Sequence, residues 1–114
     1  MDFQKSSDVL HSVIFIFPEF QNEWENANPY INEDGSYSLH SVYMVLLPYV
    51  SARKANFGDK QLKQLASLIN DAVTAGDNSE NAVSTCFLEH VYQVDLDSVL
   101  KPLLNGEAKA RLSP

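Results

Sequence analysis

Apolar side chains recur every three or four residues along most of this chain, and that spacing constrains the fold more than any other sequence feature. The clearest stripe follows Ser38, where six apolar residues keep the i, i+3, i+4, i+7 spacing of an amphipathic helix. They are Leu39, Val42, Tyr43, Leu46, Leu47 and Val50. Ser38 is the predicted N-cap, because its hydroxyl can accept a hydrogen bond from a free amide of the first turn. Pro48 is expected to bend this helix near its last turns.

Three further helical stripes follow in the second half of the chain. The first is predicted to begin at its N-cap Asp59 and to close at Gly76. The next opens at "DNSE" (residues 77–80), whose acceptor-x-x-Glu spacing matches a capping box. The last begins at Asp95 or Asp97, contains Pro102 and stops at "NG" (residues 105–106), before a short helical or frayed tail. The inward residues of the first of these helices are Leu62, Leu65, Ala66, Ile69, Ala72 and Val73. Those of the next are Val83, Cys86 or Phe87, His90 or Val91, and Val94. Those of the last are Leu96, Val99, Leu100, Leu103 and Leu104.

The first apolar segment allows two interpretations. The run "VIFIF" (residues 13–17) is rich in β-branched and aromatic residues and could form a short strand. A helix capped by Ser6 or Ser7 is favoured, because Phe20 and Trp24 continue the same helical stripe beyond Pro18. Pro18 would break or kink that helix.

Together these segments predict an all-α protein. A chain of 114 residues fits a single domain, and we find no repeat, low-complexity tract or interdomain linker. We therefore expect residues 1–114 to form one compact bundle of about five to six helices, several of them kinked by proline. The one long connection is "NANPYINEDGSYS" (residues 26–38), which is dense in Asn, Pro, Asp and Gly.

The distribution of charge along the chain is more informative about binding partners than the net charge of −7. No Lys or Arg lies between Lys5 and Arg53, and a second base-free span covers residues 64–100. The acids of the two spans are Asp8, Glu19, Glu23, Glu25, Glu33 and Asp34, and then Asp71, Asp77, Glu80, Glu89, Asp95 and Asp97. Because phosphate contacts require Lys and Arg, direct binding of nucleic acid is not expected, whereas a basic protein partner would be attracted. The alternative is that the acidity serves solubility alone.

Tyrosines beside the first set of acids suggest a binding surface. Tyr30 and Tyr37 flank the acidic loop segment "INEDGS". An exposed ring supplies contact area while a neighbouring carboxylate steers the partner. The predicted partner-binding residues are Glu19, Glu23, Glu25, Tyr30, Glu33, Asp34 and Tyr37, with the second acidic span in reserve. The alternative is that each ring merely packs the loop onto the bundle.

Catalytic and metal chemistry have weaker support. Cys86 and His90 would share one face of a helix, but the sequence offers no glycine-rich turn to supply oxyanion donors, and their apolar neighbours would raise the pKa of a thiol. His11, His40 and His90 fall on separate predicted helices, and no known metal-ligand or nucleotide-binding motif occurs. We predict no enzymatic activity, no metal and no cofactor.

The sequence also favours a cytoplasmic location. A single cysteine fits a reducing compartment, and the N-terminus lacks the features of a secretory signal. The longest apolar run, residues 13–17, is too short to cross a membrane.

Four stretches carry a family resemblance. "NSENAVSTCFLEHV" (residues 78–91), which follows "LASLINDAVTAGD", resembles small bacterial all-helical domains in which an Asn-Ala-Val and Phe-Leu-Glu helix follows a long amphipathic helix. "LKPLLNGEAKARL" (residues 100–112) and "GSYSLHSVYMVLLPYV" (residues 35–50) look similar too. Such domains are similar to immunity proteins of bacterial toxin systems, including contact-dependent growth inhibition. The resemblance implies a cytosolic protein that covers the active site of a cognate toxin, and it transfers no functional residue.

The leading hypothesis is thus an immunity protein, monomeric until it forms a heterodimer with a basic toxin domain of the nuclease type. A small cytosolic adaptor or regulatory module is the alternative, and an enzyme using Cys86 and His90 is a weaker one.

Overall fold

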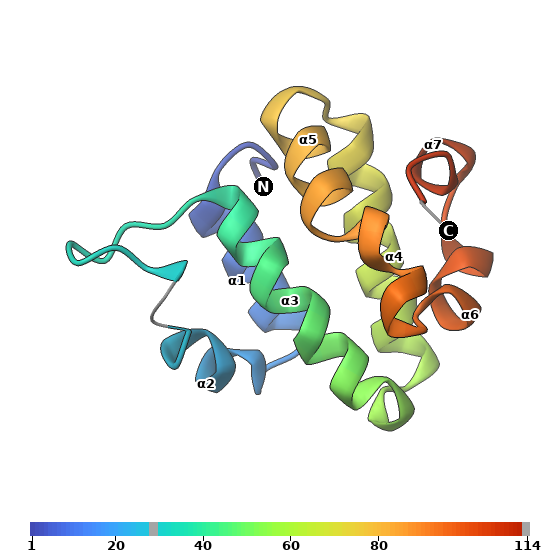
Figure 1. Cartoon of the computed structure of the whole chain (residues 1–114), viewed down its shortest axis with the longest axis horizontal. Coiled ribbons are helices and arrows are strands. Elements are labelled where there is room, and N and C mark those ends of the chain that lie inside the picture. The colour runs from blue at the N-terminus through green and yellow to red at the C-terminus, as the bar shows by residue number, and fades with distance from the viewer. Residues whose placement is uncertain (28–29, 113–114) are drawn as a thin grey trace.

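The computed structural model describes residues 1–27 and 30–112, and the all-α prediction is confirmed. Within these ranges the chain forms seven α-helices and no β-strand (Figure 1). The helices are α1 (Ser6–Ile16), α2 (Phe20–Glu25), α3 (Leu39–Arg53), α4 (Asp59–Thr74), α5 (Asp77–Cys86), α6 (Asp97–Leu100) and α7 (Gly106–Lys109). Short 3-10 helices lie at Lys54–Asn56, Leu88–His90, Tyr92–Val94 and Lys101–Leu103. No helix in these two ranges is both long and apolar enough to span a bilayer.

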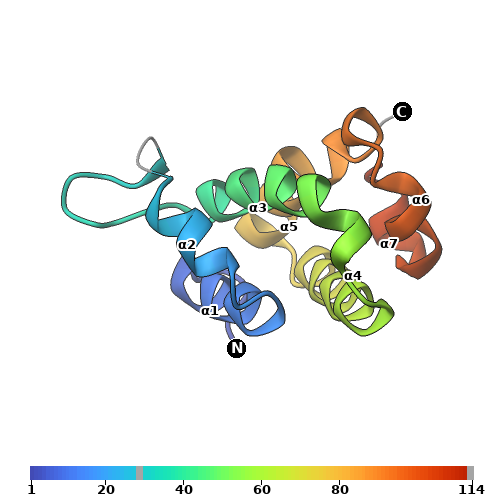
Figure 2. The same ribbon diagram turned by 90° about the horizontal axis from the view of Figure 1, so that it is seen from below.

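The helices pack around one hydrophobic core. α3 packs on α5, α5 packs on α4, and α1 lies against both α3 and α4 (Figures 1 and 2). α2 packs on α3 at one end of the molecule, while α6 and α7 pack on α4 at the other. One continuous cluster of buried side chains takes members from every α-helix. The radius of gyration is 13.0 Å, as expected for a compact domain of this size.

α3 is the most enclosed helix. Its predicted stripe is confirmed, except that Leu47 is only partly buried. Val45 and Tyr49, which lie outside that stripe, are buried as well. The reason is that α3 is covered from two directions, by α1 and α2 on one side and by α5 on the other. Pro48 lies inside α3, which continues to Arg53.

The segment of residues 13–17 is helical as far as Ile16, so the helix interpretation is confirmed. The expectation of one stripe that passes through Pro18 is wrong, because the chain turns there and Phe20 and Trp24 belong to a separate helix, α2. The predicted break at Pro18 is confirmed: proline has no N–H to donate to the preceding turn, and here the helix ends, whereas Pro48 is accommodated inside α3. The aromatic pattern persists because Phe17 and Phe20 both pack on Tyr49, with ring centroids 5.9 and 5.1 Å away.

Several predicted caps are corrected by the structure. Ser38 is confirmed, since its hydroxyl accepts from the Ser41 amide at 3.1 Å. The first helix starts after Lys5 without a side-chain cap, rather than at a capping Ser6 or Ser7. Gly58 precedes α4 in place of Asp59, and its N–H donates to the Gln61 side chain at 3.4 Å.

In the second half of the chain α5 begins at Asp77 as predicted, but its cap differs, and one predicted helix stop is a helix start. The capping box at residues 77–80 does not form, because Gly76 takes the N-cap position with φ +71° and offers no side chain. Asn105 was predicted to stop a helix, yet it begins one: its side-chain oxygen accepts from the Ala108 amide at 2.9 Å and so caps α7. The predicted last helix is therefore interrupted, with Pro102 in a 3-10 helix after α6.

The fourth predicted helix is shorter than expected. α5 ends at Cys86, because Phe87 leaves the helical region with φ −130° and ψ −68°. That change of direction buries both Cys86 and Phe87, between which the sequence could not choose. It also buries Val91 completely and leaves His90 partly exposed.

Candidate functional site

The predicted partner-binding acids lie along one edge of the molecule, on α2 and on the loop that follows it. We call Glu19, Glu23, Glu25, Glu33 and Asp34 the acidic edge. All are exposed except Glu23, which is half-buried. The exposure of the α2 acids follows from packing, because Phe20 and Trp24 take the inward face of that short helix.

The two loop acids sit on a tight turn of residues 32–36 that is held by its own hydrogen bonds. The Asn32 amide donates to the Ser36 carbonyl at 2.8 Å, and Gly35 supplies the required positive φ of +85°. The Ser36 hydroxyl and amide both donate to Asp34 Oδ1, at 2.6 and 2.9 Å. These two hydrogen bonds hold the pKa of the Asp34 carboxyl below its ordinary value, and the bond from the Ser36 hydroxyl contributes the most. The loop projects from the bundle and presents Glu33 and Asp34 to solvent (Figures 1 and 2).

The two predicted tyrosine anchors have different surroundings. Tyr37 is half-buried and packs edge-on against Trp24, with centroids 4.9 Å apart, and burial raises the pKa of its hydroxyl. The Ser6 hydroxyl donates to the Tyr37 carbonyl at 3.3 Å. Tyr37 therefore packs the end of the loop onto the bundle, as the alternative interpretation held. Tyr30 remains 38% exposed beside the acids.

A hollow of about 290 Å³ lies between α2 and α3 within the acidic edge. Tyr30, Met44 and Pro48 supply apolar lining, and Glu23 lies at its border. Met44 is 42% exposed, although it is a large apolar side chain. The sequence analysis missed Met44, yet a signal was present: Met44 is apolar but falls outside the buried stripe of α3.

The fold brings one basic residue, Arg53, next to the acidic edge. Arg53, at the end of α3, places Nη2 3.7 Å from Glu23 Oε2 and its guanidinium 4.4 Å from the centre of the Tyr49 ring. Both side chains of the ion pair are partly exposed, so the pair adds little to stability. Arg53 and Glu19 also line a second hollow of about 480 Å³, whose aromatic wall includes Phe57. A cationic partner would therefore compete with Arg53 for Glu23.

The reserve acids do not form a comparable surface. Asp71 lies on α4, Asp77 and Glu80 lie in the first turn of α5, and Asp97 lies in the first turn of α6. Glu80 is paired with Arg111. Glu89 lies in the 3-10 helix Leu88–His90, and Asp95 follows the 3-10 helix Tyr92–Val94, so the second acidic span is distributed over five elements and one of its acids is paired.

Cys86 and His90 do not share a helix face, because α5 ends between them. They still line a common hollow of about 390 Å³ together with Met44. Burial, and then the Glu89 carboxylate, raise the pKa of the Cys86 thiol. A nucleophilic thiolate requires a shift in the opposite direction. His90 Nδ1 lies 3.1 Å from the Gln93 side-chain oxygen.

The three histidines lie apart in the structure. His11 is on α1, His40 contacts Asn81 at 3.2 Å, and His90 contacts Gln93. Within residues 1–27 and 30–112, no group of three or more His, Cys, Asp or Glu side chains is arranged to hold a metal ion.

The fold and this surface define the class: a small all-helical domain with exposed acids before α3 and a hollow lined by Glu23, Tyr30 and Met44. The chain belongs to the DUF7674 family, described as a domain of unknown function, whose model matches residues 10–110. Neither a curated protein nor a solved structure matches the chain. Because the family description names no function, the resemblance to immunity proteins stays a prediction.

Proposed function

We propose that this protein is an immunity-type inhibitor that binds a cognate basic toxin domain, an RNA-degrading nuclease, and covers its active site with the acidic edge. The observation that carries the proposal is the exposure of the acids of the base-free segment before α3, one of which, Glu23, lines the hollow that holds Tyr30 and Met44. The resemblance in residues 78–91 supports the same class of protein.

The chemistry of the two surfaces is complementary. A nuclease must present Lys and Arg to bind phosphates, and carboxylates on a stable scaffold can engage those cations in place of RNA. Tyr30 and Met44 provide apolar area next to the Glu23 carboxylate, and specific protein interfaces commonly combine an apolar centre with polar residues beside it. One copy would bind one toxin domain in the cytoplasm.

An adaptor that binds some other basic protein would use the same surface. The two functions differ in one measurable property, because only an immunity protein abolishes the catalytic activity of its partner. The probe is a basic ribonuclease domain encoded by a neighbouring open reading frame, and a neighbourhood that encodes no such domain would count against the proposal.

The experiment measures inhibition of RNA cleavage and the dissociation constant for that domain, using the wild type and single reversals Glu19→Lys, Glu25→Lys and Glu33→Lys. We expect stoichiometric inhibition by the wild type and a loss of about tenfold in affinity per reversal. Glu107→Lys is the matched control, since Glu107 is exposed on α7 at the far end of the molecule. Tight binding that all three reversals leave unchanged would remove the acidic edge from the interface. Binding without inhibition would favour the adaptor.

A further inference from the structure

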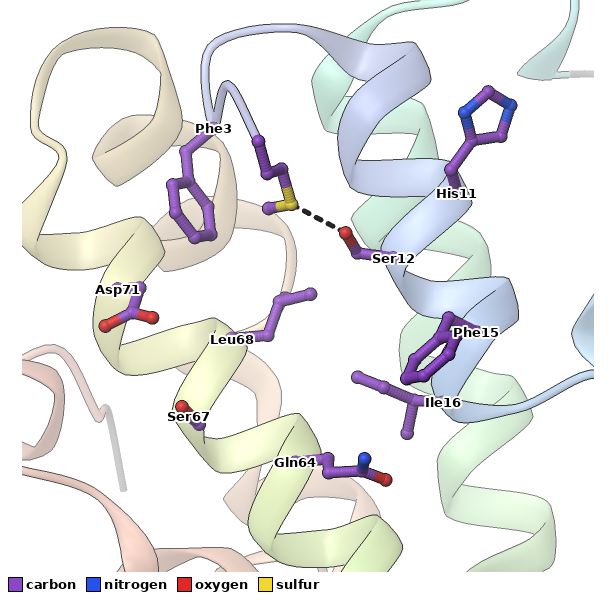
Figure 3. A pocket seen from close by; sticks show the side chains of 10 residues that line it. Phe3, His11, Ser12, Phe15, Ile16, Gln64, Ser67, Leu68 and Asp71 are labelled. Atoms are coloured by element: carbon purple, nitrogen blue, oxygen red, sulfur yellow. Dashed lines mark hydrogen bonds between the residues drawn. The ribbon is translucent and has the colours of Figure 1, made fainter.

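A second surface, formed by α1 and α4, contains an apolar groove that shares no lining residue with the acidic edge (Figure 3). The two helices run antiparallel, and hydrogen bonds tie both ends of the pair. At one end the Gln4 side chain donates to the carbonyls of Ala75 and Gly76, at 3.3 and 3.0 Å. At the other end the Gln61 side chain donates to the Ile16 carbonyl at 3.1 Å.

The groove has a volume of about 410 Å³ and two different apolar ends. Met1 and Phe3 lie at the end near Asp71, while Phe15 lies at the end near Gln64 (Figure 3). Phe15 is 79% exposed and Met1 is 59% exposed, the highest values among large apolar side chains in the described ranges. Covering them would remove a substantial apolar area from water.

Opposite charges mark the two ends. Lys60, Gln64, Ser67 and Asp71 are spaced by four, three and four residues, so they share one face of α4. Asp71 stands at the Met1 end and Lys60 lies one turn beyond Gln64 at the Phe15 end, about 16 Å away along the helix. Neither forms an ion pair with another residue of the described chain.

We propose that this groove binds the same groove of a second copy of the chain, related by a two-fold axis perpendicular to the groove. In that arrangement Phe15 of each copy meets Met1 and Phe3 of the other, and Lys60 of each copy faces Asp71 of the other. Each end of the groove is thus the complement of the opposite end, as a two-fold interface requires. A purely cationic partner would satisfy Asp71 but repel Lys60.

The net charge of −7 per copy opposes self-association. That repulsion is spread over the surface and screened by salt, whereas the two Lys60–Asp71 pairs are local. The dimer leaves the acidic edge free, so the inference does not depend on the proposed function. It replaces the monomer expected from the sequence.

Analytical ultracentrifugation of the purified chain over a wide concentration range tests the proposal. We expect the dimer fraction of the wild type to rise with concentration, and Phe15→Asp to weaken the dimer by about tenfold or more. Lys60→Glu and Asp71→Lys should each weaken it, and the double variant should recover most of the wild-type association. Phe15, Lys60 and Asp71 are all exposed, so these variants leave the core intact. Glu107→Lys is the control and should change nothing, because Glu107 is exposed on α7 and does not line the groove.

A wild type that stays monomeric throughout, or a dimer that Phe15→Asp leaves unchanged, would overturn the proposal. So would single charge reversals that weaken the dimer without recovery in the double variant. If a monomeric wild type instead used Phe15 to bind a different protein, the groove would belong to that partner.

Discussion

Two chain reversals in this molecule both depend on a glycine with positive φ, yet they are stabilised in opposite ways. The turn between α4 and α5 contains Gly76 at φ +71°, and the loop between α2 and α3 contains Gly35 at φ +85°. The first turn lies against the core, while the second projects from the bundle as part of the acidic edge.

Distant residues fasten the α4–α5 turn. Gln4, more than seventy positions away, donates to the Ala75 and Gly76 carbonyls and accepts from the Ser79 amide at 2.8 Å. Ser79 is fully buried, and its hydroxyl donates to the Ala72 carbonyl at 2.8 Å. One glutamine therefore joins the N-terminal segment, the end of α4 and the start of α5.

The turn at residues 32–36 is held only by local bonds. Its hydrogen bonds connect Asn32, Asp34, Gly35 and Ser36 to one another. On the two sides of the turn, Ile31 and Tyr37 pack against the bundle, Tyr37 on Trp24 and with its carbonyl bonded by the Ser6 hydroxyl. Because its hydrogen bonds are local, the turn at residues 32–36 can change sequence without disturbing the core. Such freedom suits a surface that adapts to one partner.

The largest expected effect comes from removing the side chain that joins the loop to the core. Trp24 is buried and contacts both Phe20 and Tyr37. Trp24→Ala should lower the free energy of unfolding by about 3–5 kcal/mol, because it leaves a large cavity. Urea denaturation followed by circular dichroism measures this change. Trp24→Phe keeps an aromatic ring and should lose clearly less; equal losses would mean that ring packing is not what anchors α2.

Gln4→Ala should give the next largest effect, a loss of about 2 kcal/mol, because it leaves the Ser79 amide unpaired in a buried position. The same denaturation measurement applies. Gln21→Ala is the matched control, since Gln21 is exposed on α2 and bonds only its neighbour Glu25. The free energy of unfolding of Gln21→Ala should stay within about 0.5 kcal/mol of the wild-type value. Similar losses in the two variants would contradict the special role of Gln4.

The two glycines provide a direct test of the comparison. A Cβ at either position meets no atom within 4 Å, so the difference between them must come from backbone strain alone. Gly76→Ala should cost about 1–3 kcal/mol, because its φ of +71° and ψ of −165° suit only glycine and the turn cannot move. Gly35→Ala should lower the free energy of unfolding by less, because a turn whose hydrogen bonds are all local can shift to relieve the strain. A larger loss at Gly35, read from thermal unfolding, would reverse the assignment of the rigid and adaptable turns.

Ser36→Ala should have the smallest effect on stability. Removal of the hydroxyl should bring the pKa of Asp34 back toward its ordinary value, as followed by NMR titration of the carboxyl. Because the folded pKa is lowered, the turn's small stabilising contribution is present above the ordinary pKa and is lost as pH falls through the lowered one. Global unfolding should change little. A large loss of global stability would show that the turn is coupled to the core.

Much of the fold could be predicted because helix periodicity is local information. The α3 stripe and the Ser38 cap depend on residues within a few positions of one another. The exposure of Glu19, Glu25, Glu33 and Asp34 could also be expected, since charged side chains rarely find partners inside a small core.

The errors arose where a local signal competed with a tertiary contact. "DNSE" has the spacing of a capping box, but Gly76 starts α5 in a turn that Gln4 fastens from the other end of the chain. Helical periodicity through residue 94 predicted a longer α5, but the helix ends where Phe87 turns into the core. Asn105 could equally stop or start a helix. In the structure it starts one, and its backbone N–H donates a hydrogen bond to Asn70 Oδ1 at 3.0 Å.

The sequence alone determined the helical class, the inward faces of the main helices and the presence of a base-free acidic segment before α3. These properties depend on spacing and composition, which neighbouring residues set among themselves. The tertiary structure decided that Arg53 reaches Glu23, and that Tyr37 packs on Trp24 while Tyr30 stays exposed. It also decided that Phe15 and Gln64 line one end of a groove (Figure 3). Those pairings depend on the path of the chain between distant residues, and helical spacing carries no information about that path.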